Sequence, residues 1–190
     1  MPKALSPKDL NRFLRSFDRS TPQGRRDYAM ALCMADCGLR VCEVADLRLE
    51  DVDWRQATFR VPATKTRRAR LLPLTSRVGR AIAAYLRNGR PLSQERGLFL
   101  LHYAPWTSAT AFTVRGALRR AYDQCGATPW SGPHALRHTL ATRMVQQGAR
   151  IKEIADVLGH VTIDTAFIYT KVNLPMLRQV AMPWPREARK

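Results

Sequence analysis

The chain has 190 residues, in which 32 Lys and Arg outnumber 15 Asp and Glu, so its formal net charge is +17 with the histidines neutral. A chain of this length buries roughly 70% of the surface that it exposes when unfolded, enough for one sizeable core. Hydrophobic residues (45%) and charged residues (25%) occur at globular frequencies, which excludes a disordered basic tail, a collagen-like chain and a low-complexity chain. The positive charge is therefore expected on a folded surface that binds a polyanion.

The sequence contains no segment typical of a transmembrane helix, because its longest uncharged stretch, residues 97–114, includes Pro105 and several polar side chains. The first ten residues lack the apolar core of a secretory signal, so we expect a cytoplasmic, nucleoid-associated protein with no membrane partner and with reduced thiols. Cys33, Cys37 and Cys42 fall in apolar helical sequence without a Cys-x-x-Cys pair. They are predicted to be buried small hydrophobic side chains rather than zinc ligands.

Three helices are predicted before residue 57. Ser6-Pro7 opens the first, which places apolar residues at positions 10, 13, 14 and 17 on one face. Thr21-Pro22 opens a longer helix that ends at Cys37-Gly38, where glycine can adopt the left-handed conformation that caps a helix. The third helix is expected to begin just after Leu39.

The rest of the chain is predicted to be one hairpin followed by helices. Strands over 58–61 and 69–72 flank a cationic tip at residues 64–68, and helices are expected over 76–88, 108–125, 134–147, 151–158 and 162–169. The predicted fold class is mainly α with a small antiparallel β-sheet (α+β). We expect residues 1–181 to form a single domain and residues 182–190, which contain Pro183 and Pro185, to fray.

Several residues stand out for their chemistry. His134 and Arg137 lie three residues apart on one face of a predicted helix, beside its apolar stripe, so a base and a guanidinium fork are presented together. Alone, such a pair is more often a helix cap and a surface arginine. However, Arg40 follows a predicted helix break with Glu43 one turn later, and His160, in Leu-Gly-His, precedes the tyrosine of Ile-Tyr-Thr by nine residues.

Together with a hairpin lysine, these residues resemble the catalytic set of the tyrosine recombinases, the phage integrase family. That family's Arg, Lys, His, Arg, His and nucleophilic Tyr are matched in type, order and spacing by Arg40, Lys65, His134, Arg137, His160 and Tyr169. The resemblance covers roughly residues 5–180. It implies the tyrosine recombinase catalytic-domain fold and a site-specific recombinase or integrase that cleaves and rejoins DNA through a covalent 3′-phosphotyrosine intermediate.

The chemistry of such a reaction suits these residue types. It needs charge stabilisation at the phosphate, a proton acceptor for the nucleophile and a proton donor for the leaving 5′ oxygen. Arg40 and Arg137 can each present a planar fork to the phosphate. A tyrosine hydroxyl has an ordinary pKa of about 10, so Tyr169 needs a base, a role that the resemblance gives to His134.

The resemblance assigns the remaining roles. It implies that Lys65 is the general acid, that His160 donates a hydrogen bond to the phosphate and that Glu43 orients the site residues. The cycle needs no cofactor, and the sequence has neither a phosphate-binding Gly-rich loop nor a carboxylate cluster suited to two Mg²⁺ ions, so no metal is expected.

Double-stranded DNA is the expected partner. Phosphate contacts are predicted for the other prominent basic residues, namely Arg67, Arg68, Arg70, Arg115, Arg119 and Arg143. The resemblance implies a tetrameric synapse on DNA. Because the chain begins where the family's catalytic domain should, without the N-terminal core-binding domain, it is either a fragment or a short single-domain member. Accessory DNA-bending proteins or a clamp domain in trans would then assist it.

Two other functions stay open on the sequence. One is a type IB topoisomerase-like activity, in which the cleaved strand rotates and rejoins itself, and the other is a catalytically silent DNA-binding or regulatory module. The chain also departs from the family pattern: Ala63-Thr64-Lys65-Thr66 replaces a Gly-rich turn, and Ala135 stands where an acidic residue is common. Lys65 is therefore assigned by its distance to Arg70 and Pro73.

Overall fold

The computed structural model describes residues 4–62, 69–126 and 132–159. In this part of the chain the helices and strands are, in order, α1 (Pro7–Arg15), α2 (Pro22–Cys37), α3 (Val41–Asp46), the 3₁₀ helix η1 (Leu49–Asp51), β1 (Val52–Asp53), β2 (Thr58–Val61), β3 (Arg70–Pro73), α4 (Ser76–Asn88), α5 (Ala111–Cys125), α6 (His134–Gln146) and α7 (Ile151–Leu158). The predicted class, mainly helical with a small antiparallel sheet, is confirmed. The helix predicted over 162–169 lies outside the described residues.

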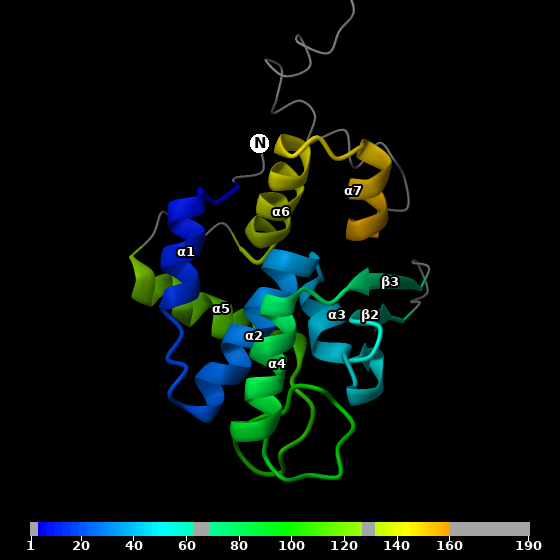
Figure 1. Cartoon of the computed structure of the whole chain (residues 1–190). Coiled ribbons are helices and arrows are strands. Elements are labelled where there is room, and N and C mark those ends of the chain that lie inside the picture. The colour runs from blue at the N-terminus through cyan, green and yellow to red at the C-terminus, as the bar shows by residue number, and fades with distance from the viewer. Residues whose placement is uncertain (1–3, 63–68, 127–131, 160–190) are drawn as a thin grey trace, which may run out of the picture.

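Helix α2 forms the centre of the molecule, and it packs against α4, α6, α5 and α3 (Figure 1). Most of its side chains are buried, as expected for a helix that is apolar on nearly every face. Two charged residues are buried with them: the guanidinium of Arg26 donates to Asp27 at 2.7 Å and to the carbonyl of Leu100 at 2.8 Å. The other helices surround α2 and bury one face each.

Side-chain caps fix where the helices begin. The hydroxyls of Ser6, Thr21, Thr75 and Thr110 accept hydrogen bonds from backbone N–H groups in the first turns of α1, α2, α4 and α5. The start predicted for the helix over 108–125 was wrong by three residues, because Thr110 caps α5 and Ser108 instead pairs with Leu100 in an isolated β-bridge.

The sheet has the antiparallel order β1-β2-β3. The predicted hairpin is confirmed as β2 and β3, with Val61 opposite Arg70 and Phe59 opposite Leu72. Strand β1 was not predicted, since two residues are too short to show an alternation. Phe59, Val61 and Leu72 are buried, so this face of the sheet packs on the core.

The cysteines follow the prediction in part. Cys33 and Cys37 are buried, and burial raises the pKa of the Cys37 thiol to about 12, so this thiol stays protonated. The prediction was wrong for Cys42, which is exposed because it lies on the outer face of α3.

Within the described ranges, no helix is both long enough and apolar enough to cross a bilayer.

Gly38 joins three helices. It ends α2 in the left-handed conformation (φ +68°), and its N–H donates to the carbonyl of Cys33. A Cβ atom built at this position would lie 2.9 Å from side-chain atoms of both Leu140 on α6 and Leu158 on α7. Glycine is therefore required twice, by the backbone and by the close packing of the three helices.

We expect Gly38→Ala to lower the free energy of unfolding by about 2–4 kcal/mol, from the left-handed backbone and the overpacking together. Gly126 is a matched control, since it ends α5 at φ +55° with nothing within 4 Å of its Cβ position. Gly126→Ala should cost only the backbone part, about 1–2 kcal/mol. Urea unfolding measures both values, and equal losses would show that the contacts with α6 and α7 contribute nothing.

Candidate active site

Arg40, Arg137 and His134 come together where α3 and α6 begin and α7 ends. Arg40 immediately precedes α3, His134 is the first residue of α6, and Arg137 lies one turn further along α6. Figure 1 shows α6 and α7 side by side at one end of the molecule, with the start of α3 and strand β3 beneath them. Segments distant in sequence thus form a single site.

The carbonyl oxygen of Leu158 brings the two arginines together. Leu158 is the last residue of α7, and Gly159 ends the helix in the left-handed conformation, so this carbonyl has no partner within the helix. It accepts from Arg40 Nη1 at 2.9 Å and from Arg137 Nη2 at 2.8 Å. Arg40 Nη2 also donates to the carbonyl of Gly159 at 3.2 Å. The negative end of the α7 dipole offsets part of the repulsion between the two cations.

Arg137 is buried and its position is fixed from two sides. Its side chain retains 4% exposure, and Nη1 donates to the carbonyl of Gly38 while Nη2 donates to that of Leu158. The guanidinium therefore links the end of α2 to the end of α7. A lysine at this position could not reach both carbonyls with a planar fork.

Glu43 receives hydrogen bonds from two arginines. Arg70 donates to both carboxylate oxygens, at 3.0 and 2.8 Å, while Arg40 donates from Nη1 at 3.2 Å and from its backbone N at 2.7 Å. Burial would raise the pKa of Glu43, but the hydrogen bonds and charges of Arg70 and Arg40 outweigh burial and lower it to about 2. The carboxylate is therefore ionised at neutral pH and hydrogen-bonded to both arginines.

A DNA contact is predicted for Arg70, and in the structure its guanidinium pairs with Glu43. Its side chain is only 11% exposed, and it faces Glu43 inside the molecule. The guanidinium also packs against Gly159, where an added Cβ would approach Nη1 to 2.7 Å. Strand alternation explains the direction, since Arg70 shares its face of β3 with buried Leu72 while Leu71 is exposed.

His134 is exposed at the start of α6. Partial burial, together with the positive charges of Arg137, Arg40 and Arg115, lowers the pKa of His134 below its ordinary value. The imidazole is therefore neutral at pH 7 and able to accept a proton. The ring of His138, which lies on the same helix, has its centre 6.4 Å away.

Three further predicted DNA contacts lie at the surface. Arg115 is exposed on α5; Arg119 pairs with Asp123 at 3.1 Å, and Arg143 lies 3.7 Å from Asp36. The Arg119–Asp123 pair is exposed, and such pairs contribute little to stability, whereas Asp36 is only 10% exposed and also pairs with Arg77. Five predicted site residues lie outside the described residues: Lys65, Arg67, Arg68, His160 and Tyr169.

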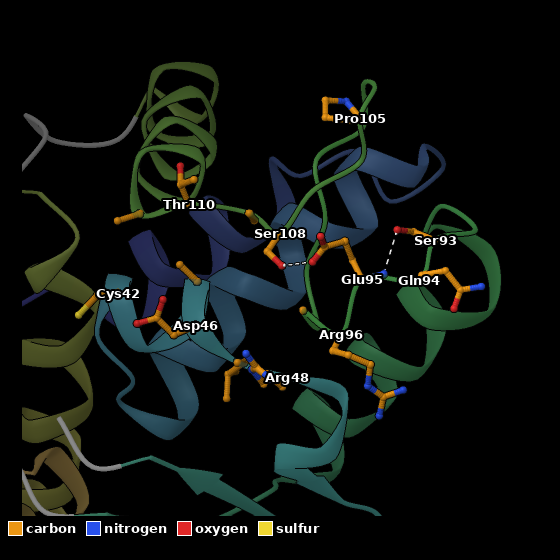
Figure 2. A pocket seen from close by; sticks show the side chains of 15 residues that line it. Cys42, Asp46, Arg48, Ser93, Gln94, Glu95, Arg96, Pro105, Ser108 and Thr110 are labelled. Atoms are coloured by element: carbon orange, nitrogen blue, oxygen red, sulfur yellow. Dashed lines mark hydrogen bonds between the residues drawn. The ribbon is translucent and has the colours of Figure 1, made fainter.

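A hollow of about 920 Å³ lies on another side of α3, between the end of that helix and the loops before α5 (Figure 2). Its walls include Cys42, Asp46 and Arg48, and Glu95 accepts a hydrogen bond from Ser108 at 3.2 Å. Arg40, His134 and Arg137 do not line it. The cationic site is thus separate from this hollow.

Sequence reasoning missed two parts of the site. The carbonyls of Gly38 and Leu158 hold the arginines, and a backbone group leaves no signature in a sequence. The inward direction of Arg70 had a weak signal, its period-2 relation to Leu72, but the neighbouring Leu71 obscures that alternation.

Comparison with known proteins agrees with this geometry. The sequence model of the phage integrase family matches residues 3–174. The chain is 43% identical to y4rA of Sinorhizobium fredii, a protein named as an integrase/recombinase, over 99% of this chain and 46% of that protein. It is 38% identical to a second such protein of that organism, y4gC, over 97% of each. Tyrosine recombinase XerC of Oceanobacillus iheyensis is 31% identical over 96% of this chain and 61% of its own length.

Solved structures show the same fold. The crystal structure of XerA recombinase superposes with a TM-score of 0.81 at 27% identity, over 95% of this chain and 64% of that chain. XerH site-specific recombinase bound to its palindromic difH substrate superposes with a TM-score of 0.77 at 22% identity, over 94% of this chain and 52% of that chain. The chain therefore spans about half to two thirds of most of these relatives and nearly all of y4gC.

The family model matches residues 3–174, the fold is that of a solved recombinase, and two arginines and a histidine meet at one site. This chain therefore belongs to the phage integrase family, the tyrosine recombinases.

Proposed function

We propose that this chain is the catalytic part of a site-specific DNA recombinase that cleaves and rejoins strands through a 3′-phosphotyrosine intermediate. One observation carries the proposal: Arg40 and Arg137 donate to the same carbonyl, that of Leu158, two residues before His160. Two guanidinium groups held at a single point suit the two non-bridging oxygens of one phosphate.

The reaction follows from the residues in order. The hydroxyl oxygen of Tyr169 attacks the scissile phosphorus and its proton passes to neutral His134, while the bond from phosphorus to the 5′ oxygen breaks. Lys65 gives a proton to that leaving oxygen. Arg40, Arg137 and His160 stabilise the added charge on the phosphate. In the reverse step a 5′-hydroxyl of a partner strand attacks the phosphotyrosine, so one phosphodiester replaces another without an external energy source.

Double-stranded DNA is the proposed substrate and partner. The net charge of +17, the exposed Arg115 and Arg119 and the half-buried Arg143 supply the positive surface for phosphate contacts. XerH is described as bound to difH in a post-cleavage complex, and the Tn1549 integrase as in complex with circular intermediate DNA. By the same analogy we propose residues 1–181 as the catalytic unit and a tetramer on DNA, assisted by DNA-bending proteins or by a clamp domain.

Tyr169→Phe tests the nucleophile. The substrate is a duplex from the DNA that flanks this gene, nicked close to the cleavage site so that the short released strand diffuses away and the adduct accumulates. Wild-type protein should give a slowly migrating, protease-sensitive band on a denaturing gel, and Tyr169→Phe should give none while it still binds the DNA. An adduct with Tyr169→Phe would assign the nucleophile elsewhere. Wild-type binding without an adduct would favour the silent DNA-binding module.

Arg40→Lys tests the guanidinium fork. Lysine keeps the charge but cannot bond Glu43, Leu158 and Gly159 together, so single-turnover cleavage should slow by about 100-fold or more, while the DNA dissociation constant changes little. Arg48→Lys is a matched control, because Arg48 is 64% exposed and lies outside the site. Cleavage by Arg40→Lys at the rate of this control would remove Arg40 from the mechanism.

The pH dependence of cleavage tests the base. Because the pKa of His134 lies below its ordinary value of about 6.5, the imidazole is neutral at pH 7 and becomes protonated only in more acidic solution. The cleavage rate should therefore be level near pH 7 and fall about tenfold per pH unit below that pKa. His134→Gln should lower the cleavage rate near pH 7 by about 100-fold or more and abolish the decrease of the rate at acidic pH. An unchanged acidic fall in the variant would point to another base.

A further inference from the structure

Arg70 lies where three segments of the site meet. It is the first residue of β3, opposite Val61 at the base of the hairpin, and its Nη1 and Nη2 atoms donate to the two oxygens of Glu43. The same guanidinium is packed against Gly159, the residue before His160. It therefore connects the hairpin, the start of α3 and the end of α7.

Each carboxylate oxygen of Glu43 accepts hydrogen bonds from both Arg40 and Arg70. Oε1 accepts from Arg40 Nη1 at 3.2 Å and from Arg70 Nη1 at 3.0 Å, while Oε2 accepts from the Arg40 backbone at 2.7 Å and from Arg70 Nη2 at 2.8 Å. The bidentate pair thus belongs to Arg70. If Arg70 were absent, the carboxylate could rotate to form a bidentate pair with Arg40 and withdraw its guanidinium from the phosphate.

Stability alone does not explain this arrangement. A buried ion pair is often no more stable than apolar side chains of the same volume, because both charges lose their water. Arg70 also has a buried Nε–H without a hydrogen-bond partner among the described residues, which is a further cost in free energy. Apolar side chains in place of both Arg70 and Glu43 would avoid these costs. What Arg70 adds is a fixed direction for Glu43 and close contact with the backbone of Gly159.

We propose that Arg70 is a positioning residue for the recombination reaction: by holding Glu43 in a bidentate pair against the end of α7, it keeps the guanidinium of Arg40 directed at the scissile phosphate. This rests on the proposed function. The other reading, that Arg70 contacts a DNA phosphate directly, is an outcome of the test.

The first experiment separates positioning from phosphate contact by DNA affinity. Arg70→Leu should leave the slope of log affinity against log salt unchanged, whereas loss of one phosphate contact lowers that slope by about 0.9. Arg60→Leu is the control, because Arg60 lies on the adjacent strand with an exposed side chain. A lower slope for Arg70→Leu would overturn the proposal, and it needs no cleavage activity.

The second experiment measures whether Arg70 acts through Arg40. At saturating protein, Arg70→Leu should slow single-turnover cleavage by about 10- to 100-fold, Arg70→Lys should recover part of that loss and Arg60→Leu should cleave as wild type. In an Arg40→Ala background, Arg70→Leu should slow cleavage by less than about 3-fold, because the group that it positions is already gone. If Arg70→Leu slowed cleavage as much in the Arg40→Ala background as in the wild type, the proposal would be overturned, since a purely structural role would act in either background.

A third readout tests the positioning role of Arg70 independently of the proposed function. The NMR resonance of the Arg40 Nε–H reports the geometry of that side chain in the free protein, and it should shift in Arg70→Leu but not in Arg60→Leu. If wild-type protein forms no adduct, the proposed function is wrong, and the salt slope and this resonance still decide the role of Arg70. An unmoved Arg40 resonance in Arg70→Leu would refute the positioning role whatever the enzyme does.

Discussion

The carbonyl oxygen of Leu158 accepts hydrogen bonds from both Arg40 and Arg137, and the arrangement of the site depends on this one acceptor. The acceptor is free because α7 stops at Gly159, and the two donors reach it because Gly38 lets α2 end in close contact with Leu140 and Leu158. The carbonyl at the end of α7, which would otherwise need a water molecule as its donor, thus brings Arg40 and Arg137 together. The catalytic geometry is therefore a consequence of how three helices terminate.

The sequence predicted most of the helices and the hairpin because their signals are local: capping hydroxyls, Pro at first turns, and glycine at α2 and α7 ends. It also placed Arg40, Glu43, His134 and Arg137, which the structure brings together. It could not supply the contacts that hold them, since those are carbonyls and ion pairs between residues up to 119 positions apart. The inward direction of Arg70 was missed because its strand carries leucines on both faces.

Charge is distributed unevenly across the site. Glu43 is 4% exposed and faces two guanidinium groups, so locally the carboxylate is outnumbered even before DNA arrives. Partial burial and the charges of Arg137, Arg40 and Arg115 lower the pKa of His134, and the surplus of positive charge favours an anion at the surface of the site. In the free protein this surplus of positive charge would be destabilising if Glu43 and the negative end of the α7 dipole did not offset part of it. The positive charge that remains suits the site to bind an anion.

The beginning of the described chain is attached to the catalytic helix. The backbone N–H of buried Leu5 donates at 2.8 Å to the hydroxyl of Thr139, which itself donates at 2.7 Å to the carbonyl of Ala135 on α6. Thr139 follows Arg137 by two residues, so this hydrogen bond ties Leu5 to the helix that carries His134 and Arg137. The segment before α1 and the helix that begins at His134 are thus joined by a hydrogen bond, although Leu5 and Thr139 lie 134 positions apart in the sequence.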